Sequence, residues 1–246
     1  MSDLDPPCVV VKNGLRHVFV ADGDGVSAGF VGNVFESWES HSFEAFARLA
    51  DPDAVAIDLG AWIGTTCISL SALFRSVVAV EPDPVSAKAL RRNLAASGCE
   101  NVTVIESACV RWPIPAVRLA PSPGGVLNES TSRLVDSSAG IFVSGISFCH
   151  VVRLAEKSGS VRLVKVDIEG SEELILEDLA AWLTVAAGSV ALVSFHVPWW
   201  RAHSVFSFRR AMSGLRARDI HGADISDTCR YISDNPWCVL ELSAVL

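Results

Sequence analysis

The stretch Ala56-Ile-Asp58-Leu-Gly60-Ala-Trp62-Ile-Gly64-Thr65-Thr66 decides the fold of this chain. The apolar run Ala54 to Ile57 ends in an acidic residue, and a G-x-x-x-G turn then leads into a helical pattern. A strand, a tight turn and a helix in this order bring the backbone close to a ligand. An alternative stays open, in which Asp58 caps the turn and the two glycines serve close helix packing.

The same alternation continues along the chain. Strands that are apolar throughout are buried on both faces, which is typical of a parallel sheet covered by helices. The pattern therefore predicts a doubly wound α/β fold with its site at the carboxyl ends of the strands. Further strands are predicted at Val77–Val80, Val102–Ile105 and Leu163–Val166, and helices at Thr65–Phe74 and at Pro84–Ser97, the latter between an Asp83 cap and a Gly98 stop.

Less regular segments surround this core. Residues 8–35 are interpreted as β-rich, which gives an N-terminal β-rich extension over 1–50 and a Rossmann-like domain over 51–246. Residues 111–145 are rich in proline and glycine and are expected to form an irregular inserted loop or lid. After residue 200 we expect a helix near Phe206–Ala217 and strands at Cys229–Ser233 and Trp237–Ser243.

Composition limits the possible partners. The 246 residues are 50% hydrophobic, and Leu179–Val197 is about long enough to cross a membrane. Gly188-Ser189 divides this run into a helix from Ser171 to about Ala187 and a strand at Val190–Phe195, so no membrane segment is expected. A net charge of −8 argues against nucleic acid. The seven scattered cysteines indicate reduced thiols, and the acidic start lacks a signal-peptide pattern, which together predict a cytoplasmic protein.

The second strand indicates the class of cofactor. It ends in Val80-Glu81-Pro82, and Glu81 stands about 20 residues after Gly60, where a carboxylate receives the ribose hydroxyls of an adenosine cofactor. A dinucleotide would need glycine where Trp62 stands, because its pyrophosphate approaches the backbone there. S-adenosylmethionine has no phosphate, and its positive charges suit Asp58. The residues favour this methyl donor, with a NAD-dependent enzyme as the alternative.

These residues resemble class I S-adenosylmethionine-dependent methyltransferases, and within them the FkbM-type family. The segment Lys165-Val-Asp167-Ile-Glu169-Gly170-Ser-Glu172 is similar to that family's K-x-D-x-E-G-x-E element, and the likeness includes Trp38-Glu39 and His196. It covers residues 36–200 and departs from the family pattern at Trp62, Val152 and Ser194. The resemblance implies a sheet ordered 3-2-1-4-5-7-6 and methyl transfer to a hydroxyl of a sugar or natural-product scaffold.

The expected site combines cofactor and catalytic residues. We expect His196 to remove a proton from the hydroxyl of a small-molecule acceptor. Asp167 or Glu169 would orient His196 or accept the proton directly, and Lys165 would neutralise Asp167 or pair with Glu169. The expected cofactor contacts are Asp58, Gly60, Ala61, Trp62, Gly64, Thr65, Glu81, Pro82, Ser107, Ala108 and Asp167.

Three alternatives for this site remain open. His196 could be a structural histidine at the end of a strand. No ligand spacing compels a metal, and we expect none, although Asp167, Glu169 and His196 have the ligand types for a divalent ion. A catalytically silent cofactor-binding scaffold would retain Asp58 and Glu81. Trp199 and Trp200 would either stack on an acceptor or anchor the core.

Overall fold

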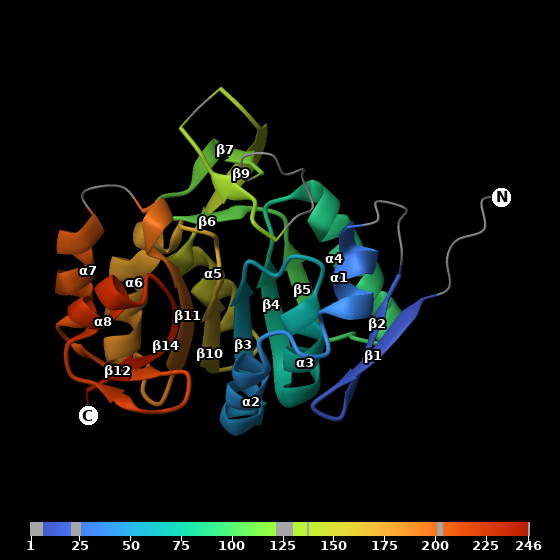
Figure 1. Ribbon diagram of the computed structural model, residues 1–246, viewed down its shortest axis with the longest axis horizontal. Coiled ribbons are helices and arrows are strands. Elements are labelled where there is room, and N and C mark those ends of the chain that lie inside the picture. Colours follow the sequence, from blue (N-terminus) through green and yellow to red (C-terminus); the bar gives the residue numbers. More distant parts are fainter. Residues whose placement is uncertain (1–6, 21–25, 122–129, 137, 201–203, 246) are drawn as a thin grey trace.

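The computed structural model describes residues 7–20, 26–121, 130–136, 138–200 and 204–245 (Figure 1). A central sheet of eight strands has the order β13-β12-β14-β11-β10-β3-β4-β5. When the two-residue β13 is left out and the other seven strands are numbered along the chain, the order read from β5 to β12 is the expected 3-2-1-4-5-7-6. The parallel strands are β3 (Asp51–Leu59), β4 (Phe74–Val80), β5 (Val102–Ile105), β10 (Val161–Val166) and β11 (Val190–His196). The antiparallel strands are β12 (Leu215–Asp219), β13 (Asp224–Ile225) and β14 (Trp237–Ala244).

Helices cover both faces of this sheet, which confirms the Rossmann-like α/β class. Alternate side chains of β3 enter different apolar layers, since Ile57 and Leu59 belong to one buried cluster and Ala56 belongs to the other. The first cluster includes buried side chains of α5 (Phe148–Ala155), α6 (Glu172–Val185), α7 (Ser204–Met212) and α8 (Thr228–Asp234). The second includes α2 (Ser40–Leu49), α3 (Thr65–Leu73) and α4 (Pro84–Ser97).

Local signals fixed several element boundaries. The bounds of α4 and β5 agree with the prediction, because the Asp83 carboxylate accepts the backbone N–H of Val85 and Gly98 ends the helix with a φ of +74°. Gly188, with a φ of +77°, separates α6 from β11 as expected. In the described part of the chain no helix has the length and apolarity to cross a bilayer.

The N-terminal segment is only partly β, so the expected β-rich extension was partly wrong. β1 (Cys8–Lys12) and β2 (Leu15–Phe19) form a hairpin, but α1 (Val26–Asn33) and α2 follow. Phe43, Phe46 and Leu49 recur at helical spacing on α2 and are buried, and this period decides the helix.

The segment 111–145 also differs from the expected irregular loop. Where it is described, with residues 122–129 and 137 outside the described part, it joins a second sheet ordered β6-β9-β7-β8. This sheet rises above the main one in Figure 1. Its pairing brings together residues far apart in sequence, such as Leu119 with Ile141. Its strands are β6 (Ala108–Val110), β7 (Ile114–Ala120), β8 (Arg133–Leu134) and β9 (Ile141–Ser147).

The C-terminal predictions were partly wrong. The strand expected at Cys229–Ser233 is helix α8, whose start is capped when the Asp227 carboxylate accepts the Arg230 N–H. The helix expected to run to Ala217 ends at Met212, and Ala217 lies in β12, paired with Leu242 of β14. The strand expected at Trp237–Ser243 is present as β14.

Candidate functional site

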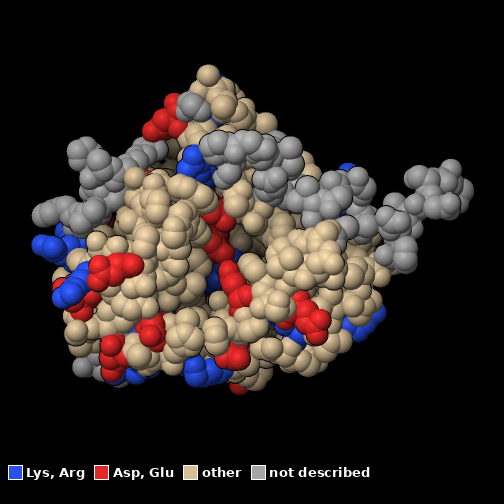
Figure 2. All heavy atoms as spheres, viewed as in Figure 1, with Lys and Arg blue, Asp and Glu red and all other residues tan. Residues whose placement is uncertain are grey.

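A cavity of about 270 Å³ opens at the carboxyl ends of β3, β4, β10 and β11. The chain order of the sheet reverses between β3 and β10, which is where doubly wound folds bind ligands. Figure 2 shows acidic atoms gathered along the hollow at the middle of the displayed face. The predicted residues that line the cavity are Gly60, Trp62, Thr65, Glu81, Pro82, Ala108, Lys165, Asp167, Glu169 and His196.

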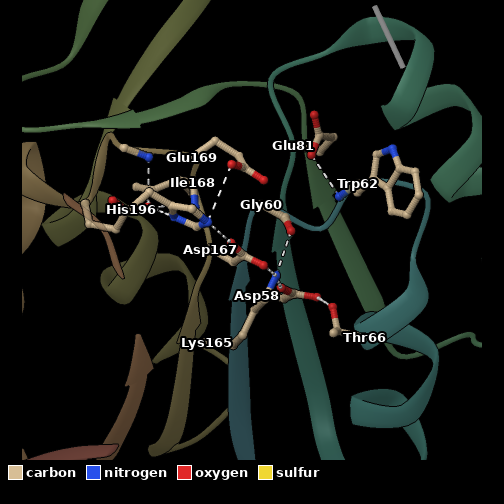
Figure 3. Close-up of polar contacts among 12 residues, drawn as sticks. Asp58, Gly60, Trp62, Thr66, Glu81, Lys165, Asp167, Ile168, Glu169 and His196 are labelled. Carbon is tan, nitrogen blue, oxygen red and sulfur yellow. Dashed lines mark hydrogen bonds and ion pairs between the residues drawn. The ribbon is translucent and has the colours of Figure 1, made fainter. Parts of the chain in front are cut away.

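A buried ion pair joins β3 and β10 beneath the cavity (Figure 3). Lys165 Nζ lies 3.1 Å from Asp58 Oδ1 and donates to the Gly60 carbonyl at 2.8 Å. Asp58 is fully buried and also accepts the Thr66 hydroxyl at 2.6 Å. Asp58 therefore holds Lys165 and the turn, and it does not itself line the cavity.

Gly60 allows the two central strand ends to meet. Its φ is +79°, and a Cβ built there would lie 1.8 Å from the backbone oxygen of Asp167. No other residue type fits so close an approach without moving the backbone. The glycine of the turn thus sets the position of Asp167 relative to β3.

Glu81 closes the neighbouring side of the cavity at the end of β4. Its Oε2 accepts the Trp62 N–H at 2.8 Å, and its Oε1 accepts the Asp83 N–H at 2.8 Å. These bonds hold both carboxylate oxygens in place, and each oxygen retains a further lone pair. Burial raises the pKa of Glu81 to about 7, although the two backbone hydrogen bonds oppose that rise.

His196, Asp167 and Glu169 form a compact cluster at the ends of β10 and β11 (Figure 3). Nε2 of His196 lies 3.5 Å from Glu169 Oε2 and 3.7 Å from Asp167 Oδ1. The three side chains offer ligand atoms within 4.8 Å of one another. The cluster can accept and hold a proton, and its donor atoms also suit a divalent cation.

Glu172 fixes the orientation of His196 from behind. Its Oε1 lies 3.0 Å from Nδ1 of His196 and accepts the Gly170 N–H, and its Oε2 accepts the indole N–H of Trp200 at 3.1 Å. Glu172 is fully buried. Because a carboxylate accepts, Nδ1 carries a proton, and Nε2 is the basic nitrogen of the neutral ring.

Crowded carboxylates shift two titrations in this cluster. Burial and the charge of Asp167 raise the pKa of Glu169 to about 8. Burial opposes the charged form of His196, but the hydrogen bond and charge of Glu172, with the charge of Asp167, raise its pKa to about 9. The free protein therefore holds His196 protonated at neutral pH, unlike a histidine with its ordinary pKa.

The N-terminal hairpin supports a further wall residue, Glu39. Lys12 is buried and donates to the backbone carbonyls of Phe35, Glu36 and Trp38, so it holds the turn before α2. Trp38 and Glu39 then line the cavity. Burial and the charge of Asp167 raise the pKa of Glu39 to about 6. Only the family resemblance indicated Glu39 in the sequence.

The remaining lining comes from the second sheet with its neighbouring residues and from the start of β14, where Trp237 pairs with His196. The sequence indicated a loop or lid over 111–145 and a strand at Trp237–Ser243, but it did not single out the residues that long-range pairing carries to the cavity. They are Leu119, Ser130, Ser132, Arg133, Leu134, Trp237 and Cys238.

Some expected contacts lie outside the cavity lining. Ala61 and Gly64 belong to the turn, and Ser107 lies 2.7 Å from the Ser144 hydroxyl. Trp199 stacks on the His196 ring with 5.4 Å between centroids, while Trp200 packs against Phe195 and Phe208. The sequence left open whether these tryptophans stack on an acceptor or anchor the core, and Trp200 anchors the core.

No protein-family model matches the sequence, and no curated protein matches it. Among solved structures, the chain is similar to an rRNA methylase from Streptococcus thermophilus, at 11% identity and a TM-score of 0.47, over 84% of this chain and 95% of that one.

Two further solved structures are similar at the same TM-score of 0.47. A putative O-methyltransferase from Klebsiella pneumoniae is 13% identical over 83% of this chain and 78% of that one. The methyltransferase FkbM from Methylobacillus flagellatus KT is 15% identical over 82% of this chain and 50% of that one.

Proposed function

We propose that this chain is an S-adenosylmethionine-dependent O-methyltransferase that acts on a hydroxyl of a small polar acceptor, such as a sugar or natural-product scaffold. The observation that carries the proposal is the acidic cavity at the switch point, with Glu81 on one side and the cluster of Asp167, Glu169 and His196 on the other.

The cavity residues fit this cofactor. Glu81 has a free lone pair on each oxygen for two ribose hydroxyls, while Asp167 and Glu39 give the cavity the negative charge that suits a cation. Trp62 stands where a dinucleotide needs a glycine, and it lines the cavity. S-adenosylmethionine, when bound, supplies a methyl group activated by a positively charged sulfur.

His196 supplies the base for a hydroxyl acceptor. Nε2 would take the proton of the acceptor hydroxyl, and the imidazolium would later release this proton to solvent. Positive charge entering the cavity lowers the pKa of His196 from about 9, because like charges disfavour its protonated form. Asp167 and Glu172 stabilise the imidazolium that forms, one on each side of the ring. Lys165, fixed by Asp58, keeps Asp167 near a compensating charge.

The buried contacts of His196 favour an enzyme over a non-catalytic scaffold, since binding alone does not need an oriented imidazole. The net charge of −8 supports a small-molecule acceptor rather than nucleic acid. All seven cysteines are free, which supports a cytoplasmic location.

Calorimetry separates this proposal from a dinucleotide enzyme. The full chain is titrated with S-adenosylhomocysteine and, separately, with NAD. We expect saturable binding of S-adenosylhomocysteine and none of NAD at the same concentrations. Binding of NAD alone would overturn the assignment. A crystal structure with S-adenosylhomocysteine would then show which walls remain for the acceptor.

A further inference from the structure

One side of the cavity carries a positive charge that the described protein does not neutralise. Arg133, in β8, and the adjacent Ser132 both line the cavity. Within the described residues, Nε of Arg133 and Oγ of Ser132 are buried without a hydrogen-bond partner. The guanidinium of Arg133 lies over the Trp199 ring, whose centroid is 5.2 Å from Cζ.

Buried donors without partners are rare, because leaving them unsatisfied is unfavourable. A guanidinium that faces a cavity has the fork geometry to bind a carboxylate or phosphate. Arg118, in β7 of the same small sheet, differs because its guanidinium has a hydrogen-bond partner in the protein. Its guanidinium donates to the Ser138 carbonyl at 3.1 Å and stacks over Phe142, and it does not line the cavity. The unmatched donors of Ser132 and Arg133 therefore lie in the cavity wall, where a ligand can supply their partners.

Charge is distributed unevenly around this cavity. Asp167 and Glu169 stand near His196, whereas Arg133 belongs to the wall from the second sheet. The Trp199 ring contacts both His196, at 5.4 Å, and Arg133, at 5.2 Å. One small molecule can thus lie near both groups. Attraction to Arg133 would orient an anionic molecule with its charged group toward the second sheet.

We infer that the methyl acceptor carries an oxyanion, a carboxylate or a phosphate, that binds Arg133 and Ser132 while its hydroxyl faces His196. The inference rests on the proposed function, because it assigns the acceptor half of the same cavity. It narrows the acceptor from a polar hydroxyl compound to an anionic one.

The test uses the full chain saturated with S-adenosylhomocysteine and probes that differ by one charged group. Calorimetry compares D-glucuronate with D-glucose, D-glucose 6-phosphate with D-glucose, and 3-hydroxybenzoate with 3-hydroxybenzyl alcohol. We expect at least one anionic probe to bind tenfold or more tightly than its neutral partner. The carboxylate and phosphate pairs then show which oxyanion the site prefers.

Variants show whether Arg133 causes this preference. Arg133→Gln should weaken the affinity for the preferred anionic probe at least tenfold and should change the affinity for the neutral probes less than twofold. Arg133→Lys, which keeps the charge but loses the fork, should give an intermediate loss. Arg118→Gln is the matched control on the same sheet and should bind as the wild type does.

Each outcome decides between the two proposals. If S-adenosylhomocysteine binds but no pair shows the tenfold preference, or if the preference survives Arg133→Gln, the oxyanion site is wrong and the cofactor assignment stands. If the wild type does not bind S-adenosylhomocysteine, the proposed function itself is wrong and the oxyanion inference falls with it. Thermal melting of each variant confirms that the compared proteins are folded.

Discussion

Glu172 holds Nδ1 of His196 at 3.0 Å from a carboxylate that the chain buries completely. The same carboxylate accepts the Gly170 N–H and the Trp200 indole N–H, so its position is set by the turn between β10 and α6 and by the segment after β11. Because these contacts come from separate segments, the imidazole orientation depends on the packed fold. Glu172 is a positioning residue for the proposed base.

Replacing Glu172 by Gln should slow methyl transfer about tenfold to a hundredfold on the plateau above pH 9, where the ring is neutral in both proteins, because the amide holds the imidazole less firmly and no longer stabilises its cation. It should also lower the pKa of His196, which Glu172 raises. The pH profile of kcat/KM and the NMR titration of His196 measure this shift. Glu177→Gln, on the outer part of the same helix and paired with Arg111, is the control. An unchanged His196 titration in Glu172→Gln would contradict the positioning role.

The rate should depend on pH through His196 itself. Only the neutral ring accepts a proton, and the pKa of His196 is about 9 in the free protein. The value of kcat/KM for S-adenosylmethionine, which reports the free protein, should therefore rise with pH and level off near pH 9. The profile of kcat should level off at a lower pH, because positive charge in the loaded cavity lowers this pKa.

Removing the imidazole with His196→Ala should reduce the methylation rate by about a hundredfold or more, since general base catalysis contributes at least that much. Calorimetry should find S-adenosylhomocysteine affinity within twofold of the wild type. A fully active variant would remove His196 as the base. Activity lost on dialysis against EDTA and restored by Mg²⁺ or Mn²⁺ would favour a metal at Asp167, Glu169 and His196 instead.

Glu81→Ala should weaken the binding of S-adenosylhomocysteine at least tenfold, about 1.4 kcal/mol, because the ribose hydroxyls lose their hydrogen-bond acceptor. The carboxylate form accepts hydroxyl protons, and its pKa is about 7, so wild-type affinity should increase severalfold from pH 6 to pH 8. Calorimetry at both pH values measures this, and the variant should lose the dependence. Glu106→Gln, at an exposed pair with Arg91, is the control. Equal affinities in wild type and Glu81→Ala would refute the cofactor contact.

The Asp58 and Lys165 pair should contribute to stability as a unit. Asp58→Asn leaves a buried ammonium without its nearest countercharge, and the free energy of unfolding should fall by about 3 kcal/mol. Urea unfolding measures the loss. The double variant with Lys165→Met should lose less than the sum of the single variants, because the unpaired charge is gone. Additive losses would show that the two side chains act independently.

Gly60→Ala tests the close approach of the two strand ends. Gly222 has a similar φ of +90° but open space around its Cβ position, so Gly222→Ala isolates the cost of the backbone conformation, about 1 kcal/mol. Gly60→Ala adds the clash with the Asp167 carbonyl and should cost about 3 kcal/mol or more. Thermal or urea unfolding compares them, and equal losses would argue against the clash.

The sequence predicted the central sheet because its signals are local. Apolar strands, the Asp83 cap and the Gly98 stop act over a few residues, and each appears where expected. Predictions failed where pairing partners or caps decided the outcome. Residues 229–233 have strand-like composition, but the Asp227 cap makes a helix, and the proline-rich 111–145 segment becomes a sheet through distant pairing.

The sequence by itself also determined which residues stand at the strand ends. Asp58, Glu81, Asp167 and His196 follow apolar strands, and the order of a parallel sheet places such ends together. Only the tertiary structure decided their roles. It places Asp58 beneath the cavity against Lys165, and Glu172 behind His196. It also brings Arg133 across from a different sheet. These relations depend on side-chain direction and long-range packing, which no local pattern encodes.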